Sequence, residues 1–230
     1  DAPLTLLADN ARWLVVDKPA GIAAIPARDE DPADSLRHRL QDQLGVPLWV
    51  VHRIDRETSG AIIYARDAQA HRALNLAFQR AQVGKTYHAW CAGAPAAAHG
   101  RIDTPMHSAR KGKMRPAQAG EPGAISACTD YAIEQQWELA GGLIARVRCH
   151  PRTGRQHQIR RHLDSVGHPV VNDATHGDSR FNRDVRSWVG DRLMLHAWSI
   201  CVPSPEALAS EAQRFDESAR GDAQARRDAS

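Results

Sequence analysis

Short apolar runs alternate with polar turns through the first ninety residues. Four segments are apolar or alternate in period 2 and are predicted to be strands: 13–16, 49–52, 61–64 and 85–91. A helix is predicted over 36–44, capped by Asp34 or Ser35 and stopped by Gly45. A second helix is predicted after Asp67, with apolar positions at helical spacing as far as the turn before residue 85.

The rest of the chain continues this pattern of strands with few helices. Residues 94–125 are rich in Ala, Gly, Pro and basic residues and are predicted to be a loop. Further strands are predicted at 129–134, 143–150, 168–171 and 193–202, and a helix at 155–163. The pattern predicts one α+β domain over residues 1–205, built on a mixed, mainly antiparallel sheet. Residues 206–230 have few apolar positions and are expected to form a polar, frayed tail.

Composition narrows the class of protein. Of the 230 residues, 42% are hydrophobic and 25% are charged, which is typical of a globular chain rather than a disordered one. No stretch approaches the roughly 20 apolar residues of a membrane helix, and the first residues lack the pattern of a signal peptide. The four cysteines lie far apart, which disfavours disulfides and zinc knuckles. We therefore expect a cytoplasmic protein with no membrane partner.

Positive charge is concentrated in two windows, 101–115 and 145–162. The formal net charge is only +3, yet the two windows hold eleven Lys and Arg residues and a single acidic residue, Asp103. Such clusters neutralise phosphates, so they favour a nucleic-acid partner. The alternative is a solvated basic face with surface salt bridges.

An acidic residue between two arginines marks the segment 51–60, which joins two predicted strands. Arg53 and Arg56 flank Asp55, and nearby positive charge favours the ionised carboxylate. Such a carboxylate can act as a nucleophile or stabilise positive charge at an electron-poor carbon. The alternative is a structural ion pair at a strand end.

The segment 154–163 places many polar groups on one predicted helix. A metal pair of His157 and His162 is disfavoured because i, i+5 spacing does not align two ligands. Asp173, His176 and Asp178 could also ligate a cation, but hydrogen-bonded loop residues are the favoured interpretation. We expect no metal site.

Together these segments resemble the RluA-type family of RNA pseudouridine synthases. The similarity spans about residues 10–203 and rests on segments 14–21, 52–60, 85–87, 154–160 and 193–197. The blocks H-R-x-D-x-x-T-S-G and G-R-x-H-Q-x-R, in this order, are highly specific. Ile54 and Ile159 stand where leucine is frequent in the family, and Gln156 stands where Thr or Ser is common.

The resemblance implies a fold and a set of roles. It implies a mixed eight-stranded sheet in two lobes with a central cleft. Asp55 corresponds to the catalytic aspartate, and Arg160 to the basic residue that pairs with this aspartate. Tyr87 corresponds to the tyrosine that assists proton transfer and packs on the target base. Arg53 corresponds to the arginine that enters the RNA as the uridine leaves. The motifs and the basic loop supply the other expected RNA contacts: His52, Arg56, Thr58, Lys111, Lys113, Arg155, His157 and Gln158.

The implied reaction is an isomerisation of uridine to pseudouridine. It breaks the bond from N1 to C1′ and rejoins the base through C5, so no cofactor is expected: no ATP, nicotinamide or metal. The base must first leave its stack, at a cost of a few kcal/mol. Two other classes stay open at this point: a catalytically idle RNA-binding module, and a nucleoside hydrolase that uses Asp55 with Glu57.

The choice of RNA rests on one further segment. Residues 168–178, followed by Asn182 and Arg183, are similar to the tRNA pseudouridine synthase C branch, which modifies a uridine in the T-arm, although Asn172 replaces the usual glycine. We therefore expect tRNA rather than rRNA as the substrate. We also expect a monomer.

Overall fold

The protein is built on one mixed sheet of nine strands. The computed structural model describes residues 2–26, 31–108, 114–118, 120–204 and 206–208. The strands are β1 (Leu6–Asp9), β2 (Trp13–Lys18), β3 (Trp49–Val50), β4 (Ser59–Ala65), β5 (Gly84–Ala92), β6 (His99–Ile102), β9 (Thr129–Leu139), β10 (Gly142–Pro151) and β11 (Leu195–Cys201). Their order is β1-β2-β4-β11-β5-β10-β9-β6, and β3 pairs with β4. Only β11 and β4 are parallel, which confirms the mixed, mainly antiparallel sheet; β3 adds a ninth strand to the eight of the main path.

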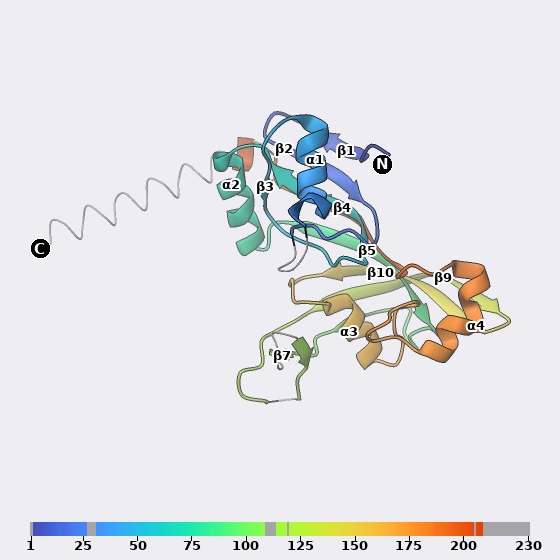
Figure 1. The fold of residues 1–230 in the computed structure, drawn as a ribbon. Helices are drawn as coiled ribbons and strands as arrows, with labels where there is room; N and C mark the ends of the chain where they lie inside the picture. Colours follow the sequence, from blue (N-terminus) through green and yellow to red (C-terminus); the bar gives the residue numbers. More distant parts are fainter. Residues whose placement is uncertain (1, 27–30, 109–113, 119, 205, 209–230) are drawn as a thin grey trace, which may run out of the picture.

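Helices cover the two halves of this sheet separately. They are α1 (Leu36–Leu44), α2 (Ala68–Gln79), α3 (Gln158–Ser165) and α4 (Ser179–Val189), with a 3-10 turn over Pro32–Asp34. The predicted caps are confirmed: Ser35 and Asp67 accept backbone N–H groups at the starts of α1 and α2, and Gly45 ends α1 at φ +67°. Figure 1 shows α1 and α2 on the N-terminal half and α3 and α4 on the other half.

Two local predictions were wrong, and one helix was not predicted. The segment 94–125 contains β6, which pairs with β9 at the sheet edge, and the two-stranded ribbon β7 (Met106–Ser108) and β8 (Met114–Pro116). The segment 168–171 is not a strand and makes only a single bridge, from Val170 to Cys91. Helix α4 was not predicted, although Asp178 caps it and its apolar positions repeat at helical spacing. Short edge strands depend on a partner that is distant in sequence, so local pattern shows them poorly.

The two halves form two lobes with separate cores. In the first lobe, one apolar cluster lies between the sheet and α2, and a second lies under α1. In the second lobe, Ile159 and Leu163 of α3 and Val185 of α4 pack on β5 and β10. Leu208 is buried in the cluster of α2, three residues beyond the domain end placed at 205. The remainder of the expected tail at 206–230 lies outside the described residues.

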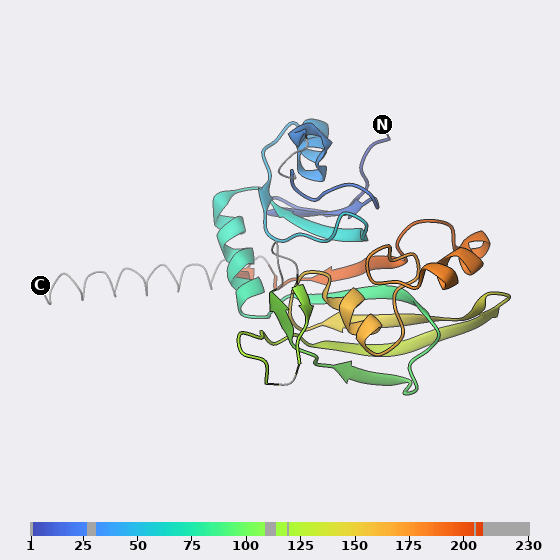
Figure 2. The ribbon, with the colours of Figure 1, turned by 60° about the horizontal axis from the view of Figure 1, so that its bottom comes forward.

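Strand β11 joins the lobes. It pairs with β4 of the first lobe and with β5 of the second, as Figure 2 shows. Its approach to β4 requires glycine at position 60, where φ is +108° and a Cβ atom would lie 2.2 Å from the carbonyl oxygen of Ala197. The last glycine of the H-R-x-D-x-x-T-S-G block is therefore needed for the joint between the lobes.

Lys18 is a buried ammonium at the end of β2. Its Nζ donates to the carbonyl oxygens of Pro19, Ile22 and Arg56 at 2.7–2.9 Å. Burial lowers the pKa of Lys18 to about 8, so the group is still mainly charged at neutral pH. It fixes the turn after β2 to the loop that carries Asp55.

No helix of the described residues is long and apolar enough to cross a membrane.

We predict that Lys18→Met lowers the free energy of unfolding by about 3 kcal/mol, because it leaves three carbonyl groups without their charged donor. Urea denaturation followed by circular dichroism measures this difference. The control is Arg183→Met, since the Arg183 side chain is 75% exposed. Equal stabilities of the two variants would contradict the structural role of Lys18.

Candidate active site

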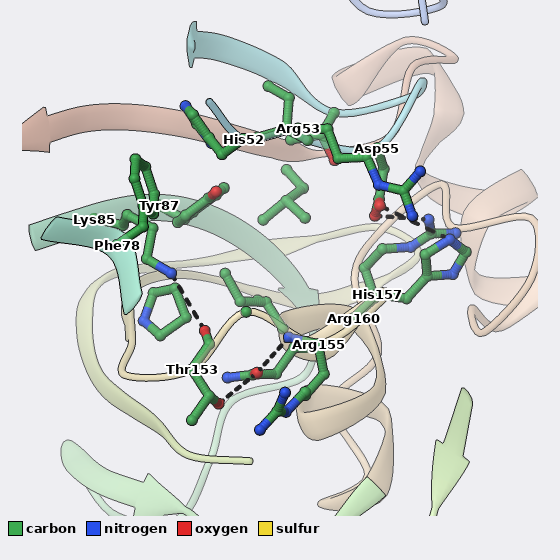
Figure 3. A pocket seen from close by; sticks show the side chains of 17 residues that line it. His52, Arg53, Asp55, Phe78, Lys85, Tyr87, Thr153, Arg155, His157 and Arg160 are labelled. Carbon is green, nitrogen blue, oxygen red and sulfur yellow. Dashed lines mark hydrogen bonds and ion pairs between the residues drawn. The ribbon is translucent and has the colours of Figure 1, made fainter. Parts of the chain in front are cut away.

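A cavity of about 260 Å³ lies between the two lobes. Its first side is the segment from His52 to Thr58, and its other side comes from β5, from Leu195 and from the segment between Pro151 and Arg160. Figure 3 shows these side chains around the space. A second hollow of about 490 Å³ adjoins it, beneath residues 23–26, and Arg53, Asp55 and Arg155 border both.

Asp55 lies in the loop between β3 and β4. The loop is held by its own turn, in which the Thr58 amide donates to the Asp55 carbonyl at 3.1 Å, and by two donors to the carbonyl of Arg56: the Gly21 amide and the Lys18 ammonium. The Asp55 side chain is 27% exposed and faces the cavity. The carboxylate is thus fixed in place and accessible.

Arg160 connects this carboxylate to a second one. Its Nη1 lies 3.3 Å from Asp55 Oδ2, while its Nε and Nη2 donate to Asp173 at 2.6 and 2.7 Å. Burial disfavours the charge of Arg160, but the bonds to Asp173 and the field of both carboxylates outweigh it and raise its pKa. The guanidinium stays charged and is held by a bidentate pair, which fixes its plane beside Asp55.

Asp173 was considered from the sequence only as a possible cation ligand, and its pairing with Arg160 was missed. Its Oδ1 also accepts the backbone N–H groups of Thr175 and His176. Burial raises the pKa of Asp173, but the hydrogen bonds from Arg160 and from these two N–H groups outweigh burial and lower it. The preceding Asn172 has φ +61°, a conformation that asparagine tolerates well, which explains why it can stand where glycine is usual. The backbone N–H of Asn172 donates to the side-chain oxygen of Asn182 in α4, so α4 helps to position Asp173.

His157 lies on the same side of the cavity. It precedes α3 in a left-handed conformation at φ +52°, which is strained for a residue with a side chain. Its Nε2 lies 3.9 Å from Asp55 Oδ1, and its Nδ1 lies 3.1 Å from Nε2 of His176. Burial lowers the pKa of both histidines, so the pair acts mainly as neutral imidazoles joined by one hydrogen bond.

Tyr87 borders the cavity from β5. Burial, and then the nearby charge of Asp55, raise the pKa of Tyr87 well above its ordinary value, so the phenol is neutral at physiological pH. Lys85 lies on the same face of β5 and donates to the carbonyl of Thr153 at 3.3 Å. An apolar ring with a neutral hydroxyl and an ammonium thus share this wall.

Several expected RNA contacts are instead engaged within the protein. The Gln158 amide donates to Cys128 and Thr129 and accepts from Thr153 and the Arg155 amide, and the residue is only 4% exposed. These hydrogen bonds of Gln158 hold the start of α3 at the border of the cavity.

His52 is also engaged internally. Its Nε2 accepts the backbone N–H of Ile63, and its ring stacks on Phe78 at 4.9 Å. Burial, with the charge of Lys85, lowers the pKa of His52 to about 3, so it carries no charge toward a phosphate. Thr58 is buried at 2% exposure, and within the described part of the chain its hydroxyl has no hydrogen-bond partner.

The remaining expected contacts are placed differently. Arg53 is exposed at the rim of both hollows, and Arg155 donates to the carbonyl of Ser126 beside the cavity. Arg56 borders the second hollow. Lys111 and Lys113 lie outside the described residues.

Many of the arginines in the two basic windows are paired with carboxylates. Acidic residues from outside the windows pair with six of their arginines: Asp55 and Asp173 with Arg160, Glu134 with Arg146 and Arg148, Asp130 with Arg101 and Arg152, and Glu121 with Arg115. The salt-bridge alternative therefore fits five of these six arginines, whereas Arg160 is buried at the cavity.

The metal candidates have other roles. Asp173 binds Arg160, His176 contacts His157, and Asp178 caps α4. Over the described ranges, no group of three or more His, Cys, Asp or Glu residues is arranged to hold a metal ion.

Comparison with known proteins agrees with this geometry. The sequence profile of RNA pseudouridylate synthases matches residues 12–165. The chain is 32% identical to tRNA pseudouridine synthase C of Yersinia pestis, over 95% of this chain and 89% of that protein. It is also 32% identical to the dual-specificity RNA pseudouridine synthase RluA of Escherichia coli (strain K12), over 88% of each.

Solved structures show the same fold. Human RNA pseudouridylate synthase domain containing 1 superposes with a TM-score of 0.74 at 26% identity, covering 89% of this chain and 80% of that one. Human RNA pseudouridylate synthase domain containing 4 gives a TM-score of 0.69 at 25% identity, over 87% and 85%.

We predict that Asp173→Asn lowers the free energy of unfolding by about 3 kcal/mol at pH 7, because it leaves the buried Arg160 without its bidentate partner. The pKa of Asp173 is lowered on folding, so its contribution is present above the unfolded pKa of about 4 and is lost as the pH falls through the lower folded value. Urea denaturation at pH 7 and at successively lower pH should show the gap between the two proteins closing with acid. A gap that stays constant would contradict the ion pair.

Proposed function

The chain belongs to the RluA-type family of RNA pseudouridine synthases, and we propose that Asp55 acts on the nucleoside in its isomerase reaction, in a tRNA. The observation that carries the proposal is the ionic arrangement at the cavity. A carboxylate that is accessible to a nucleoside is held by a buried guanidinium, whose own position is set by a second carboxylate. The two competing classes, an idle RNA-binding module and a nucleoside hydrolase, do not agree with membership of this enzyme family.

In this proposal the chain itself supplies the reacting groups. The bond from N1 to C1′ of uridine breaks, the base turns within the cavity, and C5 bonds to C1′. The hydrogen at C5 leaves as a proton and N1 takes up a proton, so the product is an isomer of the substrate. Asp55 acts at C1′, at C6, or in forming a glycal. Arg160 keeps the carboxylate oriented and offsets its charge. The electrostatic field of this fixed pair is the main source of the rate enhancement.

Tyr87 has the position of a group that packs on the base. It borders the cavity near Asp55, and its neutral phenol can donate a hydrogen bond while the ring faces the uracil. Lys85 beside it provides a positive charge for the carbonyl oxygens of the base.

Arg53 has the position of a group that replaces the extruded base. It is exposed, it follows the fixed strand end at His52, and it borders both hollows. A guanidinium inserted into the vacated stack can contact neighbouring bases and phosphates, which offsets part of the cost of extrusion.

The preference for tRNA rests on the segment from 168 to 183. Asp173 and His176 of this segment contact Arg160 and His157, which border the cavity. Relatives named tRNA pseudouridine synthase C and relatives named dual-specificity RluA are equally similar over the whole chain. An rRNA uridine is therefore the second candidate substrate.

We predict that Asp55→Asn abolishes tritium release from RNA labelled at C5 of uridine, because the neutral amide cannot replace the carboxylate in the reaction. Binding of the same RNA should stay within about tenfold of the wild type, or about 1.4 kcal/mol. The matched control is Asp42→Asn on the exposed surface of α1, which should keep full activity.

The two measurements separate the possible roles of Asp55. Loss of release together with loss of binding or of the folded state would show that Asp55 is structural. Retained release would refute the proposal.

We predict that the wild type releases tritium from an unmodified tRNA transcript and from its isolated T-arm stem-loop, but not from an rRNA transcript. Mapping of pseudouridines in RNA from cells with and without the gene identifies the position. Release from rRNA alone would favour the second candidate.

A further inference from the structure

The sheet face turned away from the cavity carries a continuous row of charged and aromatic side chains. Successive side chains of a strand point to opposite faces, so the neighbours of Tyr87 and Leu195, which border the cavity, face the other way. In Figure 2 this face lies behind the sheet, opposite α3. We call it the rear face, and its residues are Ser59, His88, Glu134, Arg146, Arg148, Arg192, His196 and Trp198.

One end of the row is built around Ser59. Its hydroxyl lies 3.0 Å from Nη1 of Arg192 and 2.9 Å from Nδ1 of His196. Within the described part of the chain, Arg192 forms no ion pair with a carboxylate; its Nη1 donates to Ser59 and to the carbonyl of Leu193. The guanidinium is therefore ordered by neutral groups and keeps its charge for an external anion.

An exposed indole forms the centre of the row. Trp198 is 60% exposed, although it is a large apolar side chain. One side of its ring stacks on His88 at 4.9 Å, and the edge of His196 lies 6.2 Å away. The imidazoles hold the indole in place and leave its outer side to solvent, which is the form of a stacking platform.

Two arginines share one carboxylate at the other end. Glu134 lies 3.1 Å from Arg146 and 3.3 Å from Arg148, and His88 lies 3.4 Å from it. Arg148 is 47% exposed. The row holds three guanidinium groups and one carboxylate, that of Glu134. Asp17, near His196, adds a second carboxylate, so the net charge of the row is positive.

We propose that the rear face binds a second segment of the substrate RNA, outside the cleft, by stacking an unpaired base on Trp198 and by contacting phosphates through Arg148 and Arg192. The proposal rests on the proposed function, since it concerns the same RNA. An exposed aromatic ring between flanking guanidinium groups is the arrangement that binds single-stranded RNA. An acidic peptide would use the same charges but would gain less from a flat, exposed indole.

The test compares a complete RNA with the part that the cleft can hold. The probes are a full tRNA transcript and its T-arm stem-loop, or the corresponding pair from whichever RNA supports tritium release by the wild type. For Trp198→Ala we expect about tenfold weaker binding of the full RNA, from the loss of one stacked base. For Arg148→Gln we expect the slope of log affinity against log salt to fall by about 1. Binding of the stem-loop and kcat should not change.

The chain offers matched controls. Trp188→Ala and Arg186→Gln alter side chains of α4 that are 65% and 66% exposed and lie outside both the row and the segment from 168 to 183, so both should bind the full RNA normally. Trp198→Phe keeps an aromatic ring and should recover most of the affinity, which separates stacking from misfolding.

Each other outcome refutes the proposal for the rear face. Unchanged affinity of Trp198→Ala and Arg148→Gln for the full RNA refutes it, as does an equal loss with both RNAs. Binding of a polyglutamate peptide that depends on Trp198, with RNA binding unaffected, would identify a protein-docking face instead. Because tritium release by the wild type is measured separately, a failure of the rear-face proposal can be distinguished from a failure of the proposed function.

Discussion

The site depends on a guanidinium that is buried between two carboxylates. Isolated in the interior, Arg160 would be strongly destabilising, and the bidentate pair with Asp173 is what makes its burial tolerable. With Asp173 satisfying two of its nitrogens, the guanidinium has a third directed at Asp55. The accessible carboxylate is thereby held by a group that is itself immobile.

This arrangement draws on segments from the whole chain. Asp55 comes from the first lobe, Arg160 from α3, and Asp173 from the loop before α4. The lobes are joined by β11 and β4, where Gly60 permits the close approach. The geometry of the site therefore depends on the joint between the lobes as well as on the ionic groups.

The distribution of positive charge follows the sheet rather than the sequence. Arginines only two residues apart in β10, such as Arg146 and Arg148, share Glu134 on the rear face, whereas Arg160 of α3 lies at the cavity. The two faces thus have different chemistry: an accessible carboxylate beside a buried guanidinium on one, and guanidinium groups around an exposed indole on the other.

The sequence by itself determined the family, the strand and helix pattern around its two motifs, the caps of α1 and α2, and Asp55 with Arg160 as the central pair. These features depend on local spacing or on residue types within a motif. Tertiary structure alone decided that Asp173 holds Arg160, that the hydrogen bonds of Gln158 hold the start of α3, and that most arginines of the basic windows are paired. Each of these depends on a hydrogen-bond partner tens of residues away or on a neighbouring strand, and no periodicity or charge count along the chain contains that information.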